Sequence, residues 1–190
     1  MSKLKRQRLS FTNKAMRALW WSVWCIFFRP TPRNFHRWRC FLLRLFGARL
    51  GKNVHPYPSA RVWAPWNLTM GDDSCLSDWV DCYSVDKIQI GRFTTISQYS
   101  FLCTASHDHS LTEMPLVIAP IRIGDYVWIT ADVFVAPGVT IGEGTVVTAR
   151  SSVFHDLPEW RIARGNPAAV ISHRILADAS GTLVSPEPRG

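Results

Sequence analysis

Aliphatic residues recur at every sixth position through the second half of the chain. They stand at positions 123, 129, 135, 141, 147 and 153, and a residue that is mostly small or β-branched follows each of them four positions later. This period matches neither the roughly 3.6-residue repeat of an α-helix nor the two-residue alternation of a strand. It indicates a prism of short strands joined by tight corners, with the aliphatic side chains directed towards the axis.

The same period is present earlier in the chain. Positions 70, 76 and 82 form one block, which Asp86 closes, and positions 90, 96 and 102 form the next, which Ser106 closes. The blocks are offset by two residues at 87–90, which indicates one lengthened corner. Because three hexads complete one triangular coil, we expect coils at residues 70–87, 90–107, 123–140 and 141–158, with a less regular fifth at 50–67.

Six glycines lie near the expected corners of this prism. Tight corners favour glycine because its backbone adopts positive φ without a steric penalty. We therefore expect positive φ at glycines 71, 91, 124, 138, 142 and 144.

The first fifty residues follow a different pattern. Residues 18–28 read ALWWSVWCIFF, eleven residues without a charge, whereas a membrane-spanning helix needs about 20 apolar residues. A signal peptide is also disfavoured, because Arg29-Pro-Thr-Pro stands where a small-residue cleavage site would be. Residues 35–46 place arginines among aromatic residues and leucines at mostly helical spacing. The sequence thus predicts two basic, aromatic helices joined by Pro30 and Pro32.

The charge of the chain is concentrated in the same segment. The formal net charge is +8, yet residues 1–52 hold 13 Lys and Arg with no Asp or Glu, and the remainder is mildly acidic. Two such helices fit peripheral contact with anionic lipid through residues 1–52. They fit equally well as a cap on the core of the prism, with their arginines in solvent. Nucleic acid is not expected, because no recognised binding motif accompanies the charge.

These patterns divide the 190-residue chain into three parts. Residues 1–49 form a helical arm, residues 50–158 the β-helix with an insert at 108–122, and residues 159–190 a C-terminal cap and tail. A hydrophobic fraction of 47% with 19% charged residues excludes a disordered chain or a coiled coil. The five cysteines are odd in number and lack a CxxC pair, so we expect reduced thiols.

The hexads resemble those of the left-handed parallel β-helix acyltransferases. The longer strings FRPTP (28–32), RLFGA (44–48), VWAPWNL (62–68), VDCYSVDK (80–87), LCTASHD (102–108) and RGNPA (164–168) are similar to the colanic acid biosynthesis acetyltransferase branch. The resemblance implies an all-β core, a left-handed β-helix of about five coils with a protruding loop. It also implies a homotrimer with active sites between neighbouring subunits, acetyl-CoA as donor and a sugar hydroxyl as acceptor. We expect the acceptor molecule to be a sugar or a lipid-linked oligosaccharide.

The repeat breaks once, between His107 and Ile121, and the insert opens with His107-Asp108-His109. Acyl transfer to an alcohol needs a base that accepts the hydroxyl proton near neutral pH, and imidazole has a suitable pKa. In related sugar acetyltransferases the first histidine at this junction is the catalytic base, and His107 matches it. His109 is the alternative base or an acceptor contact. The competing interpretation is a surface histidine in a loop.

The resemblance also suggests donor contacts. Related enzymes hold the pantetheine arm of CoA beside small residues, which here are Ala131 and Ala149, and many have a tryptophan near it, here Trp128. Relatives frequently have Gly and Lys where this chain has Thr130 and His155. Arg150 and Arg164 are the alternative partners for the CoA phosphates. For Arg150 and Arg164 a solvated surface role fits equally well, and ordinary aromatic surface is the competing interpretation of Trp128.

Acceptor contacts are expected from Asp81 and Asp86, which lie one coil before His107 and could accept hydrogen bonds from sugar hydroxyls. Corner aspartates that bond their own backbone are an equal alternative.

Two other function classes remain open. One is a zinc-dependent hydratase of the same fold with three histidine ligands, although only His107 and His109 cluster in the sequence. The other is a non-catalytic scaffold that associates with a membrane. For the acetyltransferase we expect no metal and a cytoplasmic location, at the inner face of the cytoplasmic membrane if the arm binds lipid.

Overall fold

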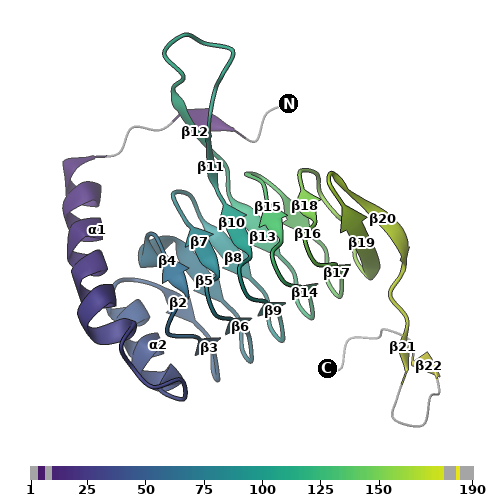
Figure 1. The fold of residues 1–190 in the computed structure, drawn as a ribbon, viewed down its shortest axis with the longest axis horizontal. Coiled ribbons are helices and arrows are strands. Elements are labelled where there is room, and N and C mark those ends of the chain that lie inside the picture. The colour runs from purple at the N-terminus through teal and green to yellow at the C-terminus, as the bar shows by residue number, and fades with distance from the viewer. Residues whose placement is uncertain (1–3, 7–9, 178–182, 185–190) are drawn as a thin grey trace.

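The computed structural model describes residues 4–6, 10–177 and 183–184. Short parallel strands stack in three sheets that form the faces of a triangular prism (Figure 1). The first face consists of β2 (Arg49–Leu50), β5 (Leu68–Met70), β8 (Ile88–Ile90), β13 (Ile121–Ile123) and β16 (Thr140–Ile141). The second face consists of β3 (His55–Pro56), β6 (Cys75–Leu76), β9 (Thr95–Ile96), β14 (Trp128–Ile129), β17 (Val146–Val147), β19 (Arg161–Gly165) and the antiparallel β20 (Ala168–His173). The third face consists of β4 (Arg61–Val62), β7 (Asp81–Tyr83), β10 (Phe101–Cys103), β15 (Phe134–Val135) and β18 (Ser152–Val153).

Each coil contributes one strand to every face. There are five complete coils, and a sixth begins where Leu157 pairs with Ile141 and continues into β19. All six aliphatic positions of the second half are buried: residues 123, 129, 135, 141, 147 and 153. The predicted left-handed parallel β-helix with an N-terminal helical arm and a protruding loop is confirmed. Beyond it, β21 (Leu176–Ala177) and β22 (Leu183–Val184) pair with each other.

The lengthened corner changes which residues point inward. Asp86 is half-exposed and Ser106 is exposed, so neither occupies the inward position expected for it. The fully buried polar residues at this corner are Ser84 and Thr104. The Thr104 hydroxyl donates to the carbonyl of Tyr83, 2.7 Å away. The period therefore placed the inward residue two positions too late in both coils, at 86 instead of Ser84 and at 106 instead of Thr104. In the second of these coils the chain leaves the prism directly after Thr104.

Most of these glycines are needed for close packing between coils and not for positive φ. Of the six glycines, only 138 and 144 have positive φ. At Gly71 an added Cβ would lie 2.6 Å from the backbone nitrogen of Arg92 in the next coil. Close approach of stacked coils therefore excludes a side chain there, whereas the left-handed corner positions are occupied by non-glycine residues such as Phe93 and Tyr126.

The predicted insert is a β-hairpin that projects from the prism (Figure 1). Its strands are β11 (Ala105–His107) and β12 (Leu116–Ile118), and the prism resumes at β13. The N-terminal strand β1 (Lys5–Arg6) adds to the other edge of β12, with Lys5 opposite Ile118. The hairpin is thus part of a three-stranded antiparallel sheet, whose third strand the sequence pattern did not predict.

The N-terminal arm forms helices that pack on the first coil. They are α1 (Phe11–Val23), the π-helix η1 (Trp24–Phe28) and α2 (His36–Leu45); the 3-10 helix η2 (Pro65–Asn67) follows the first coil. Two buried indoles fasten the arm: Trp20 Nε1 donates to the carbonyl of Val62 at 2.6 Å, and Trp24 Nε1 donates to that of Ala60 at 2.9 Å. These side chains share one hydrophobic core with the prism, so the arm caps its end.

Arg39 fixes the turn between η1 and α2. Its side chain is fully buried, and it donates to the Thr31 hydroxyl (2.8 Å) and to the carbonyls of Pro32 (2.9 Å) and Pro56 (2.7 Å). Burial lowers the pKa of the guanidinium. A buried cation is tolerated only with such hydrogen bonds, so this arginine departs from the expectation that the arm's arginines lie in solvent.

Candidate active site

His107 ends strand β11, at the point where the hairpin turns. The imidazole is exposed, and its Nδ1 atom lies 2.6 Å from the carbonyl oxygen of Met114. Since a carbonyl only accepts hydrogen bonds, Nδ1 carries the proton and donates it to Met114. The lone pair of the neutral ring is then on Nε2, which is the form that a general base requires.

The hairpin turn itself is held by Asp108. Its carboxylate accepts hydrogen bonds from the backbone nitrogen of Ser110 (3.2 Å) and from the hydroxyl of the same residue (2.5 Å). These bonds lower the pKa of Asp108. His109 is exposed in this turn, two residues beyond His107.

The face of the hairpin that carries His107 is turned towards the third face of the prism. Paired residues of an antiparallel ladder share a face, as do alternate residues along a strand. His107 therefore shares a face with Ala105, Leu116 and Ile118. The cluster on that face consists of Val85, Ala105 and Ile118, with Trp63, Tyr83 and Leu116 packed against it.

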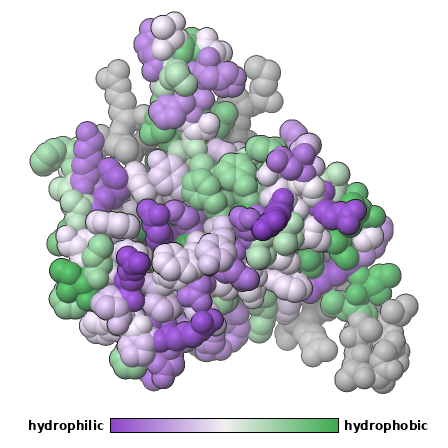
Figure 2. Space-filling model, in the orientation of Figure 1, coloured by the Kyte–Doolittle hydropathy of each residue, from purple (hydrophilic) through white to green (hydrophobic). Residues whose placement is uncertain are grey.

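An aromatic row continues along the outer side of the third face. Successive ring centroids lie 5.4 to 6.1 Å apart in the order Trp63, Tyr83, Phe101, Phe134 and Phe154. The six-residue period did not reveal this row, because it concerns the outward positions, which alternate with the core positions. It gives the third face an apolar outer surface, and Figure 2 shows hydrophobic side chains over this part of the prism.

Three of the predicted donor contacts meet in one pocket. Ala131, Ala149 and Arg150 line a hollow of about 380 Å³ together with Gln98, Tyr99 and Asp132. Both alanines lie in turns between the second and third faces, where their small side chains leave the hollow open. The guanidinium of Arg150 lies 3.6 Å from the carboxylate of Asp132, and both side chains are mainly exposed.

The other two predicted donor contacts lie outside this pocket. Trp128 stands half-exposed on the second face, and its Nε1 donates to the Ser97 hydroxyl at 3.0 Å. Arg164 is exposed on β19, opposite Ala169 of β20. The Thr130 hydroxyl donates to the carbonyl of Val147, so the threonine that replaces the usual glycine is bonded within the prism.

The pocket at Ala131 and Ala149, which we call the alanine pocket, and His107 occupy different corners of the prism. The pocket residues follow β9, β14 and β17, whereas the hairpin leaves after β10. The third face separates these two corners within one chain.

The two predicted acceptor residues have different environments. Asp81 lies on β7 with a carboxylate oxygen 3.4 Å from the guanidinium of Arg61, and burial raises its pKa against the effect of that arginine. Asp86 instead accepts a hydrogen bond from the backbone nitrogen of Lys87 at 2.7 Å. Asp86 therefore has the geometry of a corner aspartate that bonds its own backbone.

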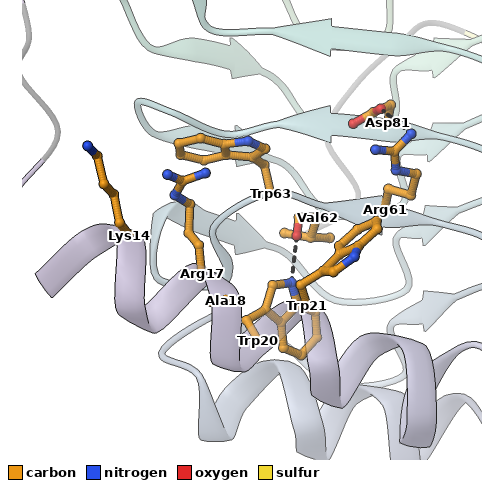
Figure 3. A pocket seen from close by; sticks show the side chains of 9 residues that line it. All are labelled: Lys14, Arg17, Ala18, Trp20, Trp21, Arg61, Val62, Trp63 and Asp81. Carbon is orange, nitrogen blue, oxygen red and sulfur yellow. Dashed lines mark hydrogen bonds and ion pairs between the residues drawn. The ribbon is translucent and has the colours of Figure 1, made fainter. Parts of the chain in front are cut away.

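Asp81 also lines a second pocket, which we call the arm pocket (Figure 3). It lies between α1 and the third face and is lined by Lys14, Arg17, Ala18, Trp20, Trp21, Arg61, Val62, Trp63 and Asp81. The sequence pattern did not predict this pocket, because it joins residues of α1 to residues forty or more positions later, and the two groups share no motif.

The histidines do not form a metal cluster within the described part of the chain. No group of three His, Cys, Asp or Glu side chains there is placed to hold an ion. His36 and His55 stack with ring centroids 4.6 Å apart, a pairing that the sequence did not indicate. Nor is any helix among the described residues long and apolar enough to cross a membrane.

Solved structures share this architecture. A maltose O-acetyltransferase from Clostridium difficile superposes with a TM-score of 0.78 over 86% of this chain and 89% of its own, at 27% identity. A hexapeptide-repeat acetyltransferase from Vibrio cholerae, solved in complex with acetyl coenzyme A, superposes with a TM-score of 0.79 over 91% and 98%, at 26% identity. No protein-family model matches the sequence.

Sequence similarity decides the family. The Escherichia coli K12 protein named "Putative colanic acid biosynthesis acetyltransferase WcaF" is 52% identical over 157 residues, which cover 83% of this chain and 86% of that protein. The chain belongs to the hexapeptide-repeat acetyltransferases. Within this acetyltransferase family it is similar to the colanic acid branch, as the strings FRPTP and VWAPWNL indicated.

Proposed function

We propose that this acetyltransferase moves an acetyl group from acetyl-CoA to a sugar hydroxyl of an exopolysaccharide or related glycan, with His107 as general base. The observation that carries the assignment of the base is the hydrogen bond between His107 Nδ1 and the Met114 carbonyl. It supports an Nε2 lone pair on an exposed imidazole, at the one break in the repeat.

The transfer is direct. Nε2 of His107 accepts the proton of the sugar hydroxyl while the hydroxyl oxygen attacks the carbonyl carbon of the thioester. The tetrahedral species collapses as the carbon–sulfur bond breaks, and the imidazolium protonates the departing CoA thiolate. Binding both substrates together supplies much of the rate. No cysteine is needed as a nucleophile; Cys82 is fully buried, and burial raises the pKa of its thiol.

The pocket beside Ala131 and Ala149 is the proposed site of the pantetheine arm. Its volume of about 380 Å³ and its two alanines suit an extended, slender chain. Arg150 at its rim is the proposed partner of a CoA phosphate, since a guanidinium pairs well with phosphate oxygens. Trp128 and Arg164 are assigned to the same donor on the family resemblance alone.

We propose a homotrimer whose active sites lie between subunits. The separation of His107 and the alanine pocket at two corners of one prism supports this arrangement. In a threefold assembly the hairpin of one subunit reaches the alanine pocket of its neighbour, which brings base and donor together. His109 and Asp81 are the proposed acceptor contacts, and Asp86 is the weaker candidate because it bonds Lys87.

Release of CoA thiol from acetyl-CoA, measured against a panel of sugars and lipid-linked oligosaccharides, tests the proposal. Acceptor-dependent thiol release that His107→Ala abolishes is the expected result. Stoichiometric zinc in the purified protein, with activity lost on chelation, would instead favour the hydratase. No acetyl transfer with any acceptor would favour a scaffold.

We also propose that the arm rests on the inner face of the cytoplasmic membrane. The outer side of its helices exposes large apolar side chains: Phe11, Leu19, Ile26, Phe27, Phe41 and Leu45. Figure 2 shows hydrophobic side chains on the side of the molecule where α1 lies. Together with the basic charge of residues 1–52, they suit an interface of anionic lipid.

Vesicle co-sedimentation tests this location with the full chain. The wild type is expected to sediment with anionic vesicles and less with zwitterionic ones, and Ile26→Ser with Phe41→Ser is expected to release it. Val170→Ser, at an exposed position on β20, is the matched control. Equal sedimentation of wild type and the double variant would remove the proposal.

A further inference from the structure

The arm pocket holds more positive than negative charge. Among its nine lining residues are three cations, Lys14, Arg17 and Arg61, and a single carboxylate, Asp81. Asp81 is engaged by Arg61 at 3.4 Å. Two cations therefore face this hollow of about 380 Å³ without a compensating carboxylate in its wall.

Arg17 is held in a position that presents its guanidinium to a ligand. The guanidinium carbon lies 3.9 Å from the centroid of the Trp63 ring, and Nε donates to Asn13 Oδ1 at 3.1 Å. Within the described residues, its two terminal nitrogens donate no hydrogen bond. A stacked guanidinium loses little freedom when its edge binds an oxyanion, and it matches the two oxygens of a phosphate or carboxylate. Figure 3 shows Arg17 against Trp63 and Lys14 beside it on α1.

The walls of the arm pocket suit a sugar. Trp21 and Trp63 contribute aromatic side chains to the lining, with Arg61 over the ring of Trp21 and Arg17 over the ring of Trp63, and an oxygen of Asp81 can accept a hydrogen bond from a hydroxyl. Aromatic rings with an apolar face and polar neighbours are the composition expected of a small-molecule site with a few orienting groups.

Trp63 also connects this pocket to the base. It packs against the cluster of Ala105 and Ile118 at the foot of the hairpin, on the face of the hairpin that His107 shares. Trp63 therefore contacts both the arm pocket and the foot of the hairpin that carries His107.

We propose that the arm pocket binds an oxyanion of the acceptor glycan, a phosphate or a sugar carboxylate, while a hydroxyl of the same glycan lies at His107. This inference rests on the proposed acetyl transfer and names the class of its acceptor: a negatively charged glycan. Lys14 and Arg17 bind the anion, Arg61 keeps Asp81 in place, and Trp21 and Trp63 contact the sugar ring.

Ligand-observed NMR titrations with glucose 1-phosphate, glucuronate, glucose and inorganic phosphate test the proposal at low salt. The two anionic sugars are expected to bind at least about tenfold more tightly than glucose, since a charge-assisted hydrogen bond exceeds a neutral one. The stronger of the two identifies the oxyanion as phosphate or carboxylate. Arg17→Gln is expected to weaken binding about tenfold, and Arg17→Lys to restore part of it.

Two variants keep the result interpretable. Lys14→Gln alters an exposed side chain and is expected to weaken the same ligands without affecting folding. Arg122→Gln, at an exposed position on the first face, is the matched control and is expected to leave binding unchanged. The proposal is overturned if glucose binds as tightly as the anionic sugars, or if Arg17→Gln and Lys14→Gln leave the Kd unchanged. It is also overturned if inorganic phosphate binds as tightly as glucose 1-phosphate, because the sugar would then make no contact.

The same titrations on His107→Ala separate this inference from the proposed function. That variant is expected to bind the anionic sugars normally while it fails to transfer acetyl groups. Normal anion binding in a protein that shows no acetyl transfer with any acceptor would refute the reaction but not the site. Acetyl transfer without preference for charged acceptors would refute the site but not the reaction.

Discussion

The imidazole of His107 donates from Nδ1 to the carbonyl oxygen of Met114, 2.6 Å away across the hairpin. Met114 adopts a left-handed conformation, with φ of 41°, at the end of the turn. The turn thereby directs a carbonyl at the ring and determines which nitrogen keeps its lone pair. The hairpin, rather than the prism, therefore sets the tautomer of the proposed base.

Removing the imidazole is expected to reduce turnover strongly. His107→Ala should lower kcat about 10²- to 10⁴-fold, the usual contribution of a general base. The KM for acetyl-CoA should change little, because the variant leaves the proposed pantetheine contacts Ala131 and Ala149 unaltered. Steady-state kinetics with a fixed acceptor measure both quantities.

His109→Ala is the comparison for that variant, because His109 is the proposed acceptor contact on the same hairpin. It removes a second exposed imidazole of the same hairpin. A loss of turnover with His109→Ala as large as with His107→Ala would show that the hairpin, and not one particular ring, is responsible.

The protonation state of the ring gives a second prediction. Long-range ¹H–¹⁵N correlation spectra of the neutral His107 ring should show the proton on Nδ1 and a bare Nε2, because the Met114 carbonyl can only accept. A spectrum dominated by the Nε2–H form would contradict the proposed base. His109 in the same sample provides an internal reference without this carbonyl contact.

The core of the prism could be predicted from the sequence, since burial enforces the six-residue period directly. Ile129 and Val147 lie where the period placed them, facing the axis on neighbouring coils. The six-residue period does not, however, reveal the physical reason why a corner position needs glycine. At Gly71 the reason is the backbone of the next coil, 2.6 Å from an added Cβ, which only stacking reveals.

The candidate site was only partly predictable from the sequence, because the period relates residues within the prism but not residues of the arm to the prism. Ala131 and Ala149 share a corner because the period aligns successive coils, so their meeting in one pocket followed from the repeat. Arg17 and Trp63 meet because a helix outside the repeat folds back on the prism. No periodicity relates these two residues, and their contact depends on how Trp20 and Trp24 dock.

Filling the alanine pocket should weaken donor binding selectively. Ala149→Leu places a branched side chain in the hollow shared with Ala131, and it should raise the KM for acetyl-CoA about tenfold or more. The acceptor KM should stay near the wild-type value. Ala15→Leu, at an exposed position on α1, is the control. An unchanged donor KM would place the pantetheine arm elsewhere.

The arm is expected to be necessary for stability because its indoles bond to the first coil. Trp20→Phe keeps most of the apolar contact but leaves the Val62 carbonyl without its donor, which should cost about 1 to 3 kcal/mol of unfolding free energy. Urea denaturation followed by circular dichroism measures the change. Leu19→Ala, which alters a 55% exposed neighbour, should change the unfolding free energy by about 0.5 kcal/mol or less. Similar values for the two variants would mean that the arm does not stabilise the prism through Trp20.

Alkaline pH should weaken the same junction through Cys40, whose thiol is buried in α2 near the Val54 carbonyl. Burial raises the pKa of this thiol from 9.0 to about 11. The unfolded chain therefore releases this proton at lower pH than the folded protein does, so stability is retained below pH 9 and is lost as the pH rises towards 11. Between those values the unfolding free energy of the wild type should fall by about 2 kcal/mol more than that of Cys40→Ala. Urea unfolding at a series of pH values measures the difference, with Cys25→Ala, which removes an exposed thiol, as the control. Parallel pH profiles for the wild type and Cys40→Ala would show that ionisation of Cys40 is not coupled to unfolding.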